Sequence, residues 1–86
     1  MIYRIYTEDK NRETIKAIMA EHFDGYSLIP CDGVWKGTSE PGLIIEVLTD
    51  HKGANGIMNR LARKIKAANQ QEGVLVASVK GYYHAV

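Results

Sequence analysis

The chain has 86 residues, of which 45% are hydrophobic and 24% are charged. These proportions are ordinary for a folded globular protein and exclude an intrinsically disordered chain. The length accommodates one small domain, which we place over residues 1–86. The net charge of +1 lacks the basic excess of a dedicated nucleic-acid-binding protein, so nucleic acid is not the expected partner.

Cysteine usage and hydropathy predict the compartment. Cys31 is the single cysteine, so it forms no internal disulfide, and a lone thiol fits a reducing environment. The first residues carry no signal-peptide pattern. No apolar run approaches the roughly 20 residues that span a bilayer. We therefore expect a soluble, cytoplasmic protein that does not associate with membranes.

The first part of the chain predicts a strand, a helix and a second strand. Residues 1–6 alternate in the manner of a half-buried strand. Apolar residues recur at helical spacing over 11–22, and Gly25 is expected to end this helix with a positive φ. A short strand over 26–29 is expected to break in the turn-forming residues 30–33.

The rest of the chain predicts a hairpin, a second helix and a final strand. Residues 50–56 are expected to form a loop or a frayed helix start, and an apolar stripe after them indicates a helix that ends near Asn69. The remaining elements are a short strand, a loop, a long strand and a last strand, over 34–36, 37–42, 43–48 and 74–79 respectively.

The element order is strand, helix, strand, strand, helix, strand. Two halves of this kind, joined by right-handed crossovers, form a ferredoxin-like α+β sandwich. We expect an antiparallel four-stranded sheet with the first and third strands at its centre. Both helices cover one face, and the other face is left for solvent or for a partner.

One segment carries a resemblance to a known family. The segment comprises Val34-Trp35-Lys36-Gly37, an acidic loop with Glu40, the strand Leu43-Ile44-Ile45-Glu46, and Thr49. It resembles the CutA divalent-cation-tolerance family, whose broader relatives are the PII signalling proteins. The resemblance implies a homotrimer assembled through sheet edges and open faces, with ligand sites in the clefts between subunits.

The candidate ligand site is built around the only tryptophan. Trp35 has a large apolar body and one N–H donor, which suits a ligand or subunit contact, although an indole half-buried over a hairpin is the alternative. Lys36 would attract an anion or would simply be solvated. We expect a small anionic, nucleotide-like molecule or a metal to bind in an intersubunit cleft. Its predicted neighbours are Trp35, Lys36, Glu40, Tyr26, Tyr82 and Tyr83.

Arg4 and Glu46 are predicted to interact. If the first and third strands are neighbours, the two charges pair across the sheet and add about 0.2–1 kcal/mol of stability. The alternative is a polar centre within an intersubunit face. The predicted interface residues are therefore Arg4, Glu46 and Trp35.

Three other functions stay open. The second helix has a basic face that would serve a nucleic-acid-binding protein, although such a face is also an ordinary solvated design. An exposed edge or hairpin would serve a module that inhibits a partner, such as a phage-encoded anti-defence protein. The third is a small enzyme or isomerase on the same fold that uses a histidine or a glutamate in an intersubunit pocket, although no nucleophile motif is present. The histidines and Cys31 lack the spacing of a zinc site, and no cofactor is assigned.

Overall fold

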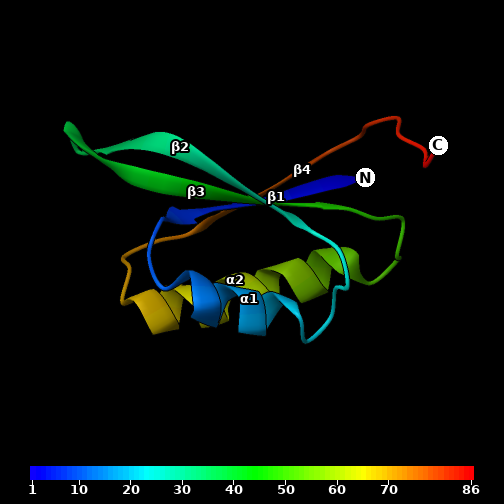
Figure 1. Ribbon diagram of the computed structural model, residues 1–86, viewed down its shortest axis with the longest axis horizontal. Helices are drawn as coiled ribbons and strands as arrows, with labels where there is room; N and C mark the ends of the chain where they lie inside the picture. Colours follow the sequence, from blue (N-terminus) through cyan, green and yellow to red (C-terminus); the bar gives the residue numbers. More distant parts are fainter.

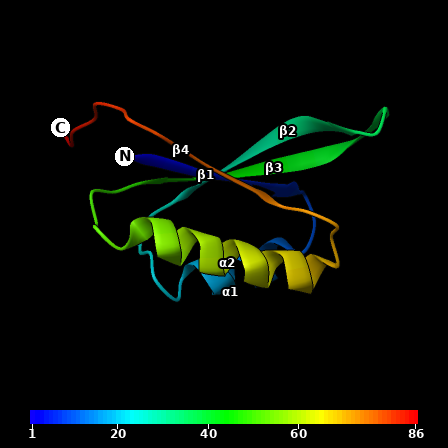
Figure 2. The ribbon, with the colours of Figure 1, turned by 180° about the vertical axis from the view of Figure 1, so that it is seen from behind.

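A four-stranded sheet and two helices form two layers in the computed structural model, which describes residues 1–86 (Figure 1). The elements are β1 (Ile2–Glu8), α1 (Arg12–Met19), β2 (Ser27–Trp35), β3 (Thr38–Leu48), α2 (Ala54–Asn69) and β4 (Leu75–Val79). The strand order is β2-β3-β1-β4, and every neighbouring pair is antiparallel. Both helices lie on one side of the sheet in the two opposite views (Figure 2). The predicted ferredoxin-like α+β fold is confirmed, including β1 and β3 at the centre of the sheet.

Alternation along the central strands places the core between the sheet and the helices. Tyr3, Ile5 and Thr7 of β1 are buried on the helix side, whereas the residues between them are more exposed. The same alternation holds in β3. The largest fully buried side chains are Ile5, Ile15, Met19, Leu43, Ile45, Met58, Leu61, Ile65 and Val47.

The β2–β3 hairpin is longer than predicted. Pro30 does not break β2, because β2 is an edge strand, where the missing N–H of proline is tolerated. The predicted loop over 37–42 is wrong as well, because β3 begins at Thr38. The turn consists of Lys36 and Gly37 alone, with φ of 51° and 77°, the positive values that a two-residue hairpin turn requires. As a result, the hairpin extends beyond the other strands (Figure 1).

The predicted end of the first helix is wrong. The first helix ends at Met19 rather than residue 22, and Gly25 has no positive φ. Instead, the N–H groups of His22 and Phe23 both donate to the carbonyl of Met19, at 3.2 and 3.0 Å, in turns that close the helix. The second helix begins at Ala54, which is buried against the core. Neither helix is long and apolar enough to cross a membrane.

The end of α2 has an unfavourable backbone conformation at Gln70. This residue has φ 53° and ψ 45°, the left-handed region that glycine favours after a helix. The N–H groups of Gln70 and Gln71 donate to the carbonyls of Ala67 and Lys66, at 3.3 and 3.1 Å, and they hold the chain there. A side chain in this region costs about 1–2 kcal/mol.

Gln70→Gly is therefore expected to raise the free energy of unfolding by about 0.5–1 kcal/mol. The substitution removes the cost of the left-handed conformation. This gain exceeds the loss of roughly 0.4–1 kcal/mol that arises because glycine makes the unfolded chain more flexible. Urea unfolding measures the change. Asn11→Gly is the comparison variant: Asn11 is also left-handed, with φ 56°, but asparagine enters this region readily and its amide donates to Asn69, so a loss of stability is expected instead of a gain. A loss of stability in Gln70→Gly would show that strain at this position is not the dominant effect.

Candidate functional site

A groove of about 640 Å³ lies where the β2–β3 hairpin faces the loop between α2 and β4. We call it the hairpin groove. The hairpin tip and this loop lie at the same end of the molecule, opposite the chain termini (Figure 1). The end of β1 also lines the groove. Among the lining residues are Tyr6, Thr7, Trp35, Glu40, Gln71 and Glu72.

The lining of the hairpin groove is acidic. It contains no lysine, arginine or histidine, and its four carboxylates are Glu8, Asp32, Glu40 and Glu72. Two of them are paired from outside the lining: Lys10 lies 2.9 Å from Glu8, and Lys36 lies 3.6 Å from Glu72. The other two have no ion-pair partner, so the groove attracts positive charge.

Trp35 adds an aromatic surface at the end of β2. The residue is 54% exposed, although it is the largest apolar side chain in the protein. The Nζ atom of Lys36 lies 5.9 Å from the centroid of its ring, a distance at which a cation is attracted to the indole face. Lys36 itself is about three-quarters exposed at the turn and is not part of the lining. Its bond to Glu72 reaches from the hairpin to the α2–β4 loop, and at this exposure it contributes little stability.

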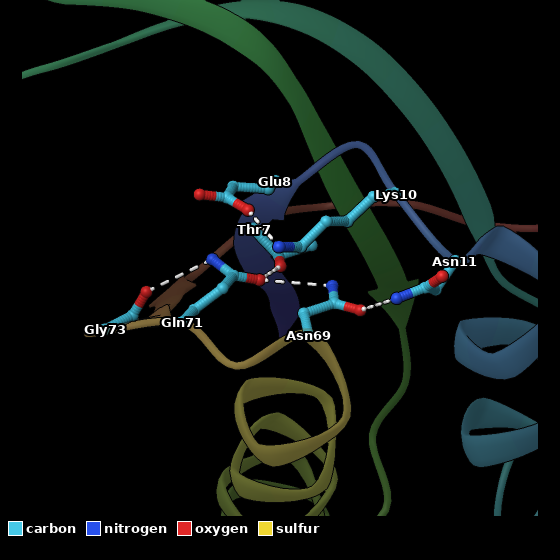
Figure 3. Close-up of polar contacts among 7 residues, drawn as sticks. All are labelled: Thr7, Glu8, Lys10, Asn11, Asn69, Gln71 and Gly73. Atoms are coloured by element: carbon cyan, nitrogen blue, oxygen red, sulfur yellow. Dashed lines mark hydrogen bonds and ion pairs between the residues drawn. The ribbon is translucent and has the colours of Figure 1, made fainter.

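A polar network supports one wall of the groove (Figure 3). The Asn11 side-chain amide donates to Oδ1 of Asn69 at 3.0 Å, and Nδ2 of Asn69 donates to Oε1 of Gln71 at 3.2 Å. The Thr7 hydroxyl donates to the same oxygen. Nε2 of Gln71 donates to the carbonyl of Gly73 at 3.4 Å. These bonds tie the ends of β1 and α2 to the start of α1 and to the loop before β4.

The predicted tyrosines lie outside the hairpin groove of the same subunit. The hydroxyl of Tyr26 donates to the carbonyl of Lys16 at 3.4 Å. Tyr82 and Tyr83 follow β4 at the opposite end of the molecule, where the C-terminus lies (Figures 1 and 2). The hydroxyl of Tyr83 donates to Asp50 at 3.4 Å, and burial together with the charge of Asp50 raises the pKa of Tyr83. One subunit therefore brings Trp35 and Glu40 together without the tyrosines, which would reach them only from a second copy.

The Arg4–Glu46 pair forms as predicted. The two residues are partners in the β1–β3 register, and Nε of Arg4 donates to the Glu46 carboxylate at 2.9 Å. The hydrogen bonds that Arg4 donates to Glu46 and then to Tyr6 raise the pKa of Arg4, so the pair stays charged. The pair lies on the open face, between two apolar rows in the sheet register: Tyr6, Ile44 and Leu75 on one side, and Ile2, Leu48 and Val79 on the other. A contact between subunits at this face stays a prediction.

The structure adds no support for a metal site or for a nucleic-acid site on the basic face of α2. No three histidine, cysteine, aspartate or glutamate residues lie close enough together to hold a metal ion. On the basic face of α2, Lys64 is already occupied by Glu21, whose carboxylate oxygens lie 2.8 and 2.9 Å from its Nζ atom. This hydrogen bond lowers the pKa of Glu21. Arg60, Arg63 and Lys66 form no ion pair within the chain.

Sequence reasoning missed the residues that the α2–β4 loop contributes to the groove and the last residue of α2, which supports them. Asn69, Gln70 and Gln71 form a run of amides at the end of a helix, which is the signal that could have drawn attention to them. Asn69 is only 2% exposed although it is polar, which is unusual unless its amide is hydrogen-bonded. That burial became visible only in the folded chain.

Comparison with known proteins gives a fold relationship only. No family model and no curated protein matches the chain. A solved structure of a phage SAM lyase in the apo state is similar, with a TM-score of 0.71 and 17% sequence identity. The match covers 87% of this chain and 75% of that chain. At this identity the likeness shows that the two chains share a fold.

Proposed function

We propose that the protein binds a small cationic molecule with an aromatic ring, of the S-adenosylmethionine class, in the hairpin groove. The observation that carries the proposal is the lining, which combines four carboxylates, no basic side chain and an exposed tryptophan. Carboxylates favour a ligand cation, and the indole face favours both a cation and a stacked ring. The regular hairpin and the polar network hold the two walls in place.

The structural neighbour supports the choice of ligand class. It is a SAM lyase, and SAM (S-adenosylmethionine) carries a sulfonium cation next to an adenine nucleoside. Such a ligand keeps the nucleotide-like character expected from the sequence. It replaces the expected negative charge of the ligand by a positive one, because the lining contains four carboxylates and does not include Lys36.

We also propose that the protein works as a homotrimer related to the CutA and PII proteins. The open sheet face with its two apolar rows supports this assembly, as does the separation of Trp35 from the tyrosines of the same subunit. In a ring of copies, the tail of one subunit would approach the groove of the next. Native mass spectrometry reports the assembly and any bound small molecule together. A clean monomer would contradict the trimer but would leave the groove of each subunit intact.

Isothermal titration calorimetry with SAM tests the ligand class. We expect a dissociation constant below about 1 mM, which corresponds to about 4 kcal/mol of binding free energy. The matched control is S-adenosylhomocysteine, a neutral thioether that lacks only the sulfonium methyl group and its charge. It should bind about tenfold more weakly, a loss of the size expected for one cation–π or carboxylate contact. Absence of binding to SAM, or equal affinity for ATP, would overturn the proposed function.

A further inference from the structure

The side-chain amide of Gln71 has only one allowed orientation. Its Nε2 atom faces the carbonyl of Gly73, which can only accept a hydrogen bond, so the nitrogen and not the oxygen must lie on that side. Oε1 then faces Thr7 and Asn69, both of which donate to it (Figure 3). The orientation of Asn69 follows in turn, because its Oδ1 atom accepts from Asn11.

The partners that hold this amide are buried. Thr7 and Asn69 are 7% and 2% exposed, so neither can turn to water without losing a hydrogen bond in the interior. Both lone pairs of the Gln71 oxygen are used by these donors. The amide therefore offers no free acceptor.

One N–H of Gln71 has no partner in the protein. Nε2 carries two hydrogens, and Gly73 takes one of them in a long bond of 3.4 Å. Gln71 lines the hairpin groove together with Thr7 and Gly73, and its side chain is only partly buried, so the second N–H is accessible to a ligand in the groove. Because this amide is already fixed, it loses little conformational entropy when a ligand binds. Its free N–H can donate only to a ligand atom that is a hydrogen-bond acceptor.

We propose that Gln71 is the specificity-determining donor of the groove and that its free N–H binds a ring nitrogen of the adenine base. This inference rests on the proposed function. Asp32 and Glu40, the two carboxylates of the lining without an ion-pair partner, disfavour the other strong acceptor of SAM, its carboxylate. An uncharged heteroaromatic nitrogen suffers no such repulsion, and its ring lies flat against an aromatic neighbour such as Trp35 or Tyr6.

The test combines three SAM analogues with one variant. In each analogue a single ring nitrogen, N1, N3 or N7, is replaced by C–H. The wild-type protein should bind one of the three about tenfold more weakly than SAM, as expected for one lost hydrogen bond. Gln71→Met should bind SAM about tenfold more weakly and should bind that same analogue with the affinity of the wild type. Asn55→Met, which removes an exposed amide at the other end of α2, should change neither affinity.

The outcomes separate this inference from the proposed function. If the wild type binds SAM and all three analogues equally, Gln71 is not the donor, and the proposed function still stands. If Gln71→Met weakens SAM and every analogue alike, the residue only shapes the loop, and the inference fails. If the wild type does not bind SAM, both fail together. Should Gln71→Met not fold, the analogue series and the shift of the Gln71 side-chain ¹⁵N–¹H signals on the wild type remain decisive.

Discussion

Ile45→Ala is expected to lower the free energy of unfolding by about 3–4 kcal/mol. Ile45 has no exposed surface, and it lies on the helix side of β3 between Ile5 of β1 and Leu28 of β2. Removing its side chain leaves a cavity that the sheet and helices cannot close. A domain of this size has a total stability of roughly 5–10 kcal/mol, so the loss is a large fraction of it. Urea unfolding followed by circular dichroism measures the change.

Ile44→Ala is the matched control for the core variant. Ile44 is the adjacent residue of β3, but it lies on the open face, opposite Tyr6. Because part of its surface remains in water, its truncation should cost only about 1 kcal/mol. An equally large loss in Ile44→Ala that depends on protein concentration would show that a second copy covers the open face. Equal losses at every concentration would contradict our assignment of the core.

Trp35→Ala is expected to weaken SAM binding by about 30-fold with little effect on stability. The indole provides the largest apolar surface of the groove, and aromatic residues commonly dominate binding energy in this way. Since the side chain is half exposed at the end of the hairpin, its loss leaves no cavity in the core. Calorimetric titration gives the affinity, and thermal unfolding gives the stability.

Two further variants define what the Trp35 result means. Trp35→Phe keeps an aromatic face and should recover most of the affinity. Tyr82→Ala removes an aromatic side chain that is 92% exposed and outside the groove of its own subunit, so a single-subunit site predicts no change. A loss of affinity in Tyr82→Ala would place the site between subunits. Unchanged affinity in Trp35→Ala would remove the tryptophan from the binding site.

Local patterns were sufficient for the fold because the core alternates along the strands and repeats along the helices. Residues such as Tyr3 and Ile5 are buried as their positions in the strand predict, and the Arg4–Glu46 pair follows once β1 and β3 are neighbours. The length of the β2–β3 hairpin could not be predicted from local patterns. Pro30 indicates a break by its own chemistry, and only the position of β2 at the sheet edge removes that constraint.

The sequence by itself therefore determined the layers, the strand order and one ion pair, since these depend on short-range periodicity and on simple rules of connection. The tertiary structure decided the sign of charge in the groove. Its four carboxylates come from β1, the β2–β3 hairpin and the α2–β4 loop, and no local pattern reports that they line one groove whose lining contains no basic side chain. The polar network was also decided there, because it joins Thr7 to Gln71 across 64 positions of the chain. Contacts of this kind exist only after the helices have packed on the sheet.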